Sequence, residues 1–535
     1  MSLFVNPPPD GFQAIRNYEI YVDKSGLILY TNRVMNTPMG LICFSRPRRF
    51  GKSFSAKMLA AYYVRGFDTA ALFDDLQAAK EDPELYRRHR NQYDVLFLDI
   101  SFFLSRASTP AAALNDLQSS VIRELRQLYP AYVEPQTDVL FDAMAQAAAG
   151  SGQKFYVVID EWDAFFREAK EDEVLQKEYI RLLRNLFKSS QTPQVIAGAY
   201  MTGILPIKKY GTQSALTDFK EYTMLSAGPL APYAGFTEDE VKDLCSRTWL
   251  NFEDTKKWYD GYRLDGEAHV YNPNSIVEAI SRRRLDSYWT QTETYDSLRV
   301  YIDMNYDGLK DGIVEMLGGK SCRVNTRGFQ NDMTSVTCRD DIYTLLVHLG
   351  YLSYNADTKS VFIPNEEIRE EFISAIQMGK RTELVKAVQL SDRLLKATLR
   401  MDEETCAELI GEAHLSNTSP KNYNNEQALR SVILMAYLSC VDDYHRFEEL
   451  AGGRGYSDIL FLPVPASGKP ALLVELKWNK SADAGVAQIL DRGYARAVKQ
   501  FGYEGEILLV GINYSTRTGE HTCRIQKLSS GKDAD

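Results

Sequence analysis

Two carboxylates and a lysine near the end of the chain have the types and spacing needed for metal-dependent phosphodiester cleavage. Asp458 lies within an apolar run over 456–462, and Glu475 and Lys477 lie at the end of a second run over 471–476. Both runs are rich in strand-forming residues. Because side chains alternate along a strand, Lys477 shares the face of Glu475 and could orient or deprotonate the attacking water.

The segment 463–470 between the two runs contains prolines and a glycine, which predicts a hairpin loop. If the pairing is symmetric about the flanking residues, Pro463 faces Pro470, and Asp458 then lies opposite Glu475. Two like charges at paired positions normally destabilise a sheet. A divalent cation that both carboxylates coordinate is a physical reason to keep them there. The sequence therefore predicts a Mg²⁺ site between the arms of this hairpin.

Predicted helices on either side of the hairpin add further polar groups. The helix expected over 424–437 carries Glu426 in its first turn, where it could be another metal ligand. After the hairpin, four polar residues recur at helical spacing and form a face suited to a phosphate backbone. They are Gln488, Arg492, Arg496 and Lys499. Of these, Gln488 and Arg492 are the predicted nucleic-acid contacts.

The order of helix, hairpin and helix resembles the PD-(D/E)xK nuclease superfamily, over a domain expected to span 386–535. The resemblance implies that Asp458 and Glu475 hold the metal and that Lys477 is the catalytic lysine. It also implies that Glu426 is the acid of the preceding helix and Gln488 the glutamine of the following one.

The sequence departs from that superfamily at one position and allows a second interpretation. Ser457 stands before Asp458, where the superfamily has a proline. The triplet 475–477 could also be a solvated strand edge with an ion pair. The apolar residues before the triplet and the matching acid across the hairpin favour the active-site interpretation.

A second group of residues, near the start of the chain, is suited to binding phosphate. Gly51, Lys52 and Ser53 follow an apolar run over 40–44 and lead into a predicted helix. This is the context that a P-loop requires, with the lysine on the β- and γ-phosphates and the serine hydroxyl on Mg²⁺. Arg46 stands where the first glycine of the general pattern would be. The helix N-terminus adds its dipole to the site.

The apolar run over 155–161 ends in two acids, which strengthens the P-loop interpretation. In such NTPases Asp160 would hold Mg²⁺ through its water shell, and Glu161 would polarise the attacking water. An ordinary strand-to-helix junction with capping acids is the alternative. The two motifs together favour nucleotide binding, whereas turnover is less firmly indicated.

Two further apolar runs, over 95–99 and 195–201, read as buried parallel strands of the same sheet. The second run ends at Thr202, which is well placed to sense the γ-phosphate. In ATPases with such a sensor residue, its strand lies between the P-loop strand and the acid strand, and this likeness implies the same order here. An amphipathic helix is predicted over 179–187 between the last two strands.

Longer stretches around these motifs look like the AAA-ATPase-like family of bacterial proteins, whose members commonly carry a C-terminal PD-(D/E)xK nuclease domain. The matching stretches are 21–28, 46–53, 159–163, 202–203, 235–241, 258–262 and 271–275. The resemblance implies ATP and Mg²⁺ as cofactors and makes Arg46 a family feature. Arg46, Arg48 and Arg49 could contact phosphate or a neighbouring domain, or remain partly solvated. We assign Arg49 to the nucleotide site.

Composition indicates a large globular protein of the cytoplasm. The chain has 535 residues, 44% of them hydrophobic and 25% charged, which are ordinary globular values. Its seven cysteines show no CxxC spacing, so neither a zinc site nor a disulfide framework is predicted. No signal pattern or membrane-spanning run is evident. The net charge of −10 argues against a protein that coats DNA, although a channel can be locally basic.

We therefore expect an α/β fold with a P-loop NTPase domain built on a parallel sheet over 1–232. A helical lid and winged-helix-like region follows over 233–385, with a helix at 340–349 and a hairpin at 351–364. A restriction-endonuclease-like α/β domain covers 386–535. The expected function is ATP binding and hydrolysis that controls Mg²⁺-dependent cleavage of nucleic acid, taken to be DNA.

Two other classes of function stay open at this stage. The chain could be a nucleotide-operated switch whose nuclease-like domain binds nucleic acid or a protein partner without cleaving. It could also be an ATPase scaffold that assembles as a homo-oligomer around a partner.

Overall fold

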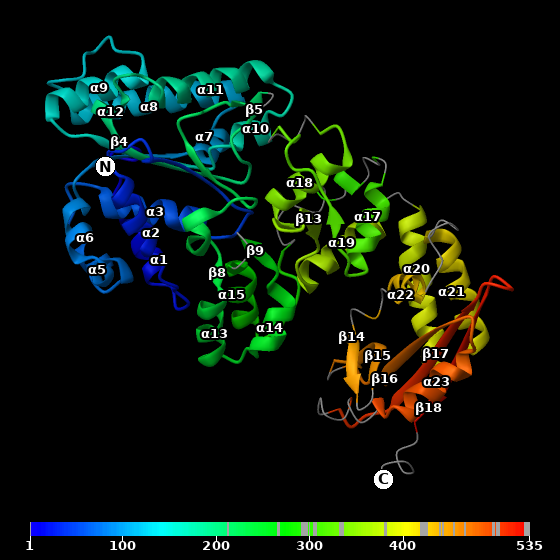
Figure 1. Cartoon of the computed structure of the whole chain (residues 1–535). Coiled ribbons are helices and arrows are strands. Elements are labelled where there is room, and N and C mark those ends of the chain that lie inside the picture. The colour runs from blue at the N-terminus through cyan, green and yellow to red at the C-terminus, as the bar shows by residue number, and fades with distance from the viewer. Residues whose placement is uncertain are drawn as a thin grey trace. The chain divides into compact units, whose positions relative to one another are not determined.

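The chain forms two compact units in the computed structural model. Figure 1 labels the helices and strands and colours them by residue number. The first unit comprises Met1–Gln291 and Arg323–Ile368, and the second comprises Thr292–Cys322 and Arg369–Asp535. The described residues are 2–210, 213–264, 268–289, 298, 300–302, 306, 308–330, 336–378, 382–417, 426–437, 440, 443–452, 455–464, 467–494, 498 and 503–528. The domain limits expected at 232 and 385 remain predictions.

The first unit is built on a five-stranded parallel sheet with the strand order β2-β3-β4-β1-β7. Its strands are β1 (Leu41–Ser45), β2 (Asp94–Asp99), β3 (Phe155–Asp160), β4 (Ile196–Gly203) and β7 (Lys220–Tyr222). All residues of β3 and β4 are buried, as expected for parallel strands covered on both faces. The parallel strands predicted from the apolar runs are confirmed. The predicted position of β4, between the P-loop strand β1 and the acid strand β3, is also confirmed.

Helices cover this sheet on both faces. The helix α3 contacts β3 and β4, and the long helices α8, α9 and α11 contribute to the main apolar core against the strands. The predicted amphipathic helix is the C-terminal part of α11. The helices of the first unit are α1 (Asp10–Arg16), α2 (Gly26–Val34), α3 (Lys52–Tyr63), α4 (Ala70–Phe73), α5 (Gln77–Glu81), α6 (Pro83–His89), α7 (Ile100–Arg106), α8 (Pro110–Leu128), α9 (Leu140–Ser151), α10 (Ala164–Glu168), α11 (Glu173–Phe187), α12 (Thr192–Val195), η1 (Gly228–Tyr233), α13 (Glu238–Ser246), α14 (Phe252–Tyr259), α15 (Pro273–Arg282) and α18 (Arg339–Leu349).

Smaller sheets complete the first unit. One has the strand order β8-β10-β9 and packs with α13, α14 and α15 around its own apolar cluster. The predicted helix and hairpin of the middle region are α18, β12 and β13, although their identification as a winged helix remains a prediction. The short strands are β5 (Lys209–Tyr210), β6 (Gln213–Ser214), β8 (Phe236–Thr237), β9 (Tyr262–Leu264), β10 (Ala268–Tyr271), β12 (Ser353–Asn355) and β13 (Ser360–Phe362). The elements β11 (Cys322–Arg323) and α19 (Glu366–Met378) cross the division between the units.

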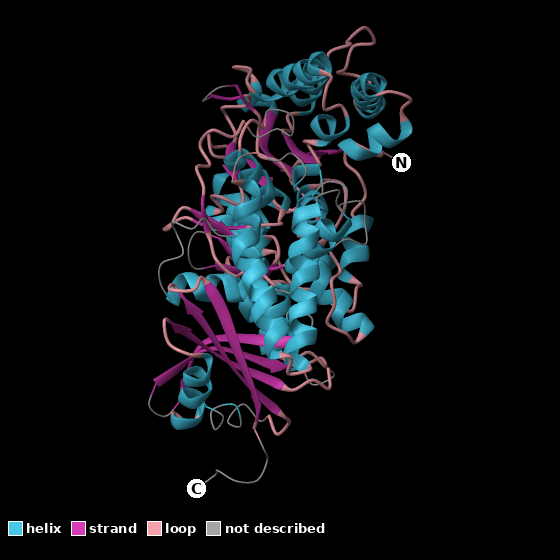
Figure 2. Ribbon diagram, turned by 90° about the vertical axis from the view of Figure 1, so that its right-hand side faces the viewer, coloured by secondary structure: helices cyan, strands magenta, loops and turns pink. Residues whose placement is uncertain are grey.

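The second unit is built on a mixed sheet with the strand order β14-β15-β16-β17-β18. Only β16 and β17 run parallel, and α23 connects them. Figure 2 shows these strands near the C-terminus, with helices on both faces. The elements are α17 (Leu309–Leu317), α20 (Thr382–Leu399), α21 (Glu403–Asn417), α22 (Glu426–Ala436), β14 (Tyr444–Gly452), β15 (Gly455–Pro463), β16 (Ala471–Trp478), α23 (Ala482–Asp491), β17 (Ile507–Ser515) and β18 (Glu520–Lys527).

Alternation along β16 decides which face each side chain occupies. Leu472, Val474 and Leu476 join the core formed with α20, α21 and α22. Ala471 and Leu473 join a separate core with α23. Because Glu475 and Lys477 continue the second series, they lie on the α23 face of the sheet.

The helices of the described ranges vary in length and in apolar character. None of them combines the length and the apolar character that crossing a bilayer requires.

Candidate functional site

The phosphate-binding motif of the first unit forms the junction between β1 and α3. Gly51 precedes α3 with φ of +83°, a left-handed conformation that glycine adopts without strain. Lys52 is the first residue of the helix and is only 7% exposed. Its Nζ donates a hydrogen bond to the main-chain oxygen of Pro47 at 2.6 Å. Ser53 is half-buried in the first turn, where its hydroxyl can reach a ligand at the helix N-terminus.

The electrostatic surroundings of Lys52 set its charge. Burial lowers the pKa of Lys52, and the nearby carboxylates of Asp160, Asp163 and Glu161 offset part of that decrease. The resulting pKa is about 8. The lysine is therefore mostly charged at neutral pH. Among the described residues, its hydrogen-bond acceptor is the Pro47 carbonyl. A buried cation in such surroundings gains strongly from a phosphate group, because charge-assisted hydrogen bonds are the stronger kind.

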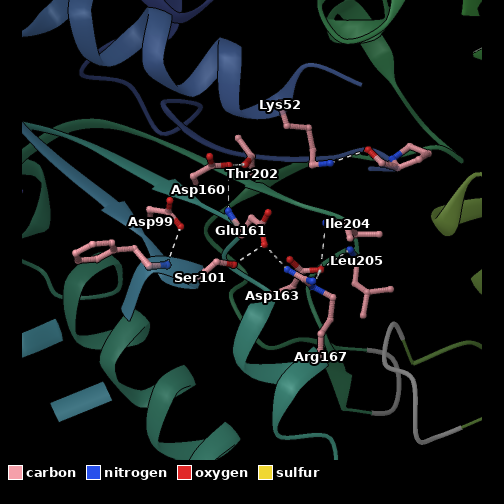
Figure 3. A network of polar contacts seen from close by, with 12 residues as sticks. Lys52, Asp99, Ser101, Asp160, Glu161, Asp163, Arg167, Thr202, Ile204 and Leu205 are labelled. Carbon is pink, nitrogen blue, oxygen red and sulfur yellow. Dashed lines mark hydrogen bonds and ion pairs between the residues drawn. The ribbon is translucent and has the colours of Figure 1, made fainter. Parts of the chain in front are cut away.

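The acids at the C-terminal end of β3 lie among groups from three strands, as Figure 3 shows. Asp160 is 4% exposed and accepts hydrogen bonds from the Thr202 hydroxyl and from the main-chain N–H of Glu161. Thr202, at the end of β4, is fully buried. On the other side, Asp99 of β2 is the register partner of Asp160. Burial raises the pKa of Asp99, and the charges of Asp160 and Glu161 raise it further.

Glu161 has a left-handed backbone conformation, and its carboxylate accepts hydrogen bonds from two side chains. Its φ of +52° is left-handed, which is uncommon for a non-glycine residue and often marks a functional position. One of its oxygens, Oε2, accepts from the Ser101 hydroxyl and from Arg167, both at 2.6 Å. Burial alone would raise the pKa of Glu161, but the Ser101 hydrogen bond and the Arg167 charge outweigh it and lower the pKa.

Asp163 connects this group to the loop after β4. It is fully buried and accepts from the main-chain N–H groups of Ile204 at 3.1 Å and Leu205 at 2.9 Å. Arg167, one helical turn later, lies 3.5 Å from the same carboxylate. Asp163 and Arg167 together fix the loop that follows Thr202.

Sequence reasoning assigned no role to Ser101, Asp163 or Arg167. Ser101 follows the predicted strand over 95–99, and parallel strands end at one edge of a sheet. That geometry was the available signal for placing Ser101 beside Glu161. No comparable pattern indicated the ion pairs of Arg167.

The arginines of the P-loop have different surroundings. Arg46 is fully buried, with its guanidinium 4.4 Å from the centre of the Phe44 ring and a hydrogen bond to the Ser45 carbonyl. Arg49 adopts a left-handed φ of +67° and donates to the main-chain oxygen of Tyr288 at 2.9 Å. This hydrogen bond joins Arg49 to the segment that follows α15. The expected contact of Arg49 with nucleotide stays a prediction.

The second candidate centre lies on the hairpin of β15 and β16. The observed pairs Ile459↔Val474 and Phe461↔Leu472 give the register that the two prolines predicted. Continued by one residue, that register sets Asp458 opposite Glu475. The Asp458 carboxylate accepts a hydrogen bond from the main-chain N–H of Leu476 at 2.7 Å, so it turns toward β16.

Glu475 lies at the middle of this centre and is 2% exposed. Its Oε1 accepts from Lys477 Nζ at 2.9 Å and from the Gln488 amide, so the structure brings these three residues together. Its Oε2 is buried and has no hydrogen-bond partner among the described residues. Burial and the Asp458 charge raise the pKa of Glu475, and Lys477 offsets only part of the increase. A buried carboxylate oxygen without a partner, beside a second carboxylate, is the donor set that a hard divalent cation prefers.

For the other predicted residues of this centre, the structure shows no hydrogen bond to Glu475 among the described residues. Arg492 is exposed at the end of α23 and donates to the Tyr494 hydroxyl at 3.3 Å. Glu426 begins α22, but its side chain lies outside the described residues, as do Arg496 and Lys499. Arg430, which sequence reasoning missed, donates to the Asp458 main-chain oxygen at 3.0 Å.

Comparisons with solved structures give distant similarities. A Walker-type ATPase of Pyrococcus abyssi is 12% identical with a TM-score of 0.32, covering 65% of this chain and 94% of that one. The ORC2 protein of Aeropyrum pernix, solved as ADPNP-ADP complexes, is 12% identical with a TM-score of 0.25, covering 67% of this chain and 97% of that one. At TM-scores this low, neither similarity carries an argument about function.

Comparison with curated proteins finds no match. The model of one family, described as predicted AAA-ATPase, matches residues 10–212, a range that contains the P-loop, both acids of β3 and Thr202. This part of the chain is therefore similar to the predicted AAA-ATPase family.

Proposed function

We propose that the chain binds ATP together with Mg²⁺ in the first unit and hydrolyses it. The observation that carries this proposal is the buried Lys52 at the start of α3, close enough to Asp160 and Glu161 for their charges to offset part of the decrease in its pKa that burial causes. A helix N-terminus with a buried lysine attracts the anionic phosphates, and the two acids are the groups that would hold Mg²⁺ and orient the attacking water.

Each side chain then has a distinct role in that reaction. Lys52 exchanges its bond with the Pro47 carbonyl for a phosphate oxygen. Thr202 fixes the orientation of Asp160. Glu161 orients the attacking water and accepts its proton once Ser101 and Arg167 release its Oε2. Ser53 and Asp160 are the hard oxygen donors that would hold Mg²⁺, which neutralises phosphate charge when bound.

The second unit supplies a metal-dependent nuclease centre in this proposal. Asp458 and Glu475 are the metal-binding carboxylates, and Glu426 at the start of α22 is a further ligand. Support comes from the buried, unpartnered Oε2 of Glu475 and from the hairpin register. Lys477 donates to Glu475 and to the Leu476 carbonyl, which holds its ammonium group where an attacking water would be oriented.

The proposed target is nucleic acid, and its cleavage is under the control of bound nucleotide. Nucleic acid, in the first instance DNA, binds along α23 through Gln488 and Arg492. The nucleotide state of the first unit controls cleavage by the second. Assembly as a homo-oligomer belongs to the same proposal.

The test measures cleavage of linear and single-stranded DNA by the full chain with Mg²⁺ or Mn²⁺ and with or without ATP. We expect Glu475→Gln and Lys477→Ala each to reduce cleavage by about 10²–10⁴-fold, the usual range for loss of a group active in catalysis. The matched control is Lys480→Ala, because Lys480 is exposed three residues later on the same segment and should change nothing.

Three outcomes separate the possible functions. Cleavage that survives both active-centre substitutions removes the proposed nuclease chemistry. Metal-dependent DNA binding without any cleavage identifies a nucleotide-operated binding protein instead. Cleavage that ignores ATP and is unchanged in Lys52→Ala removes the control by nucleotide while leaving the nuclease centre in place.

A further inference from the structure

A histidine and two carboxylates converge in the small β8-β10-β9 sheet, away from both centres described above. They are Glu238 at the start of α13, Asp260 at the end of α14 and His269 on β10. Each residue offers one ligand atom, and these atoms all lie within 4.8 Å of one another. They come from separate elements, so the fold and not local sequence brings them together.

The backbone around these residues explains why they meet. In the antiparallel pairing of β8 with β10, Thr237 is opposite Val270, so Glu238 follows directly beside His269. Thr237 also caps α13 through a reciprocal capping box with Glu240, which fixes the first turn that carries Glu238.

Asp260 is held just as firmly. Its main-chain oxygen accepts from the Asn365 amide at 2.8 Å. The next residue, Gly261, has φ of +108° and packs so closely on Pro364 that an added Cβ would lie 2.0 Å from the Pro364 carbonyl oxygen. Only glycine fits this turn, so the position of the Asp260 carboxylate is set by the backbone.

The contacts within the cluster already resemble a set of metal donors. His269 Nδ1 lies 3.0 and 3.1 Å from the two oxygens of Asp260, which is 7% exposed. Glu238 pairs with Lys242 at 2.7 Å and with Lys256 at 3.0 Å. Both lysine side chains are more than a third exposed and can swing into solvent, which frees the Glu238 carboxylate for another cation.

Tyr271 gives an independent indication that this cluster takes a ligand. It lies two residues after His269 on β10, so both side chains project from one face of the strand. Tyr271 is completely buried, and its hydroxyl has no hydrogen-bond partner among the described residues. A buried polar group normally has a partner, and a metal-bound water would supply one.

We propose that Glu238, Asp260 and His269 form a divalent metal site that accommodates Zn²⁺, with a metal-bound water hydrogen-bonded to Tyr271. One imidazole and two carboxylates match the nitrogen and oxygen donors that zinc accepts, and the water completes a tetrahedral arrangement. The ion ties the start of α13, the end of α14 and β10 to one another. Its role is to stabilise this part of the first unit, independently of either proposed catalytic centre.

The test uses the full chain, stripped with a chelator and free of nucleotide. The substitutions Asp458→Asn and Glu475→Gln form the background, so that the hairpin centre contributes no metal. Calorimetric titration with Zn²⁺ and elemental analysis should find about one equivalent bound per chain in this background. His269→Gln and Asp260→Asn should each weaken that binding by about 100-fold or more, and Tyr271→Phe by about tenfold.

Two controls separate metal binding from a general effect on folding. His89→Gln removes a histidine that instead bonds to Tyr93, and it should bind zinc like the background protein. Circular dichroism checks that each variant is folded. Cobalt(II) in place of zinc gives visible absorption bands that report its ligands, and these bands should change in Tyr271→Phe and disappear in His269→Gln.

Thermal unfolding supplies a second readout. Zinc should raise the Tm of the background protein and of His89→Gln, but not that of His269→Gln. Equal zinc stoichiometry and an equal Tm increase in His269→Gln and the background overturn the proposal. In that case the three residues form an ordinary histidine–carboxylate ion pair with a lysine-neutralised glutamate beside it.

Discussion

Lys52 and Lys477 are both buried beside carboxylates, yet the two units hold them in different ways. Lys52 begins a helix and donates to a main-chain carbonyl, whereas Lys477 lies on a strand and donates to Glu475 two residues earlier. Exchanging a carbonyl for a phosphate strengthens the bond, so the first arrangement favours an anion. A lysine that neutralises only part of a carboxylate pair leaves negative charge, so the second arrangement favours a cation.

The glutamates of the two centres differ in the same sense. Two donors lower the pKa of Glu161, while burial and Asp458 raise the pKa of Glu475. Glu161 is therefore ionised and already bonded, whereas Glu475 keeps one oxygen without a partner among the described residues. In the proposed function, Glu161 is released from its two donors before it accepts a proton, whereas Glu475 binds a cation.

The largest effect expected from this contrast follows Glu161→Gln. An amide cannot accept the proton of the attacking water, so kcat for ATP hydrolysis should fall by about 10²–10⁴-fold while ATP affinity changes little. Glu171→Gln, at an exposed position on the same segment, is the matched control. Steady-state kinetics and equilibrium binding measure the two quantities. An unchanged kcat would show that Glu161 is only a structural acid, and the contrast between the glutamates would fail.

A smaller loss is expected for Lys52→Ala. A charged hydrogen bond contributes about 1.5–3 kcal/mol, so affinity for ATP should fall by roughly 10–150-fold. The exposed Lys57 on the same helix provides the control Lys57→Ala, for which affinity should be unchanged. Fluorescence titration with a labelled nucleotide gives both values. Equal affinities in wild type and Lys52→Ala would contradict the assignment of Lys52 to phosphate.

The two centres also show which features sequence patterns can and cannot predict. The hairpin register followed from two prolines and strict alternation, so Asp458 and Glu475 could be paired by counting. The position of β4 followed from the likeness to ATPases whose sensor strand lies between the P-loop strand and the acid strand, because buried apolar runs alone give no strand order. The bonds of Ser101 and Arg167 to Glu161 could not be obtained in this way, because they depend on the side-by-side pairing of β2 and β3 and on the direction of α10 after Asp163. Tyr271 and Asp260 were not linked for the same reason: their contact is tertiary.

The low pKa of Lys52 predicts a pH dependence of nucleotide binding. Bound phosphates stabilise the charged lysine, so its pKa rises on binding from about 8 in the free protein. The affinity for ATP should therefore be highest below pH 8, where Lys52 is charged. Above pH 8 it should fall by at most about tenfold per pH unit. Titrations of wild type and Lys52→Met over this range provide the measurement, and the variant should show no such slope. A flat profile in wild type would mean that Lys52 does not change its protonation on binding.

The smallest effect concerns the hydroxyl that holds Glu161. Ser101→Ala removes one of two donors to Oε2, and a hydrogen bond of this kind contributes about 1 kcal/mol, so kcat should rise by roughly fivefold as Glu161 becomes easier to release. Ser105→Ala removes a hydroxyl that bonds only within α7, to Phe102, and should leave kcat unchanged. If kcat falls instead, Ser101 orients Glu161 for catalysis and does not restrain it. The first unit would then resemble the second, in which Lys477 and Gln488 donate hydrogen bonds to Glu475 and would hold it in place for the proposed reaction.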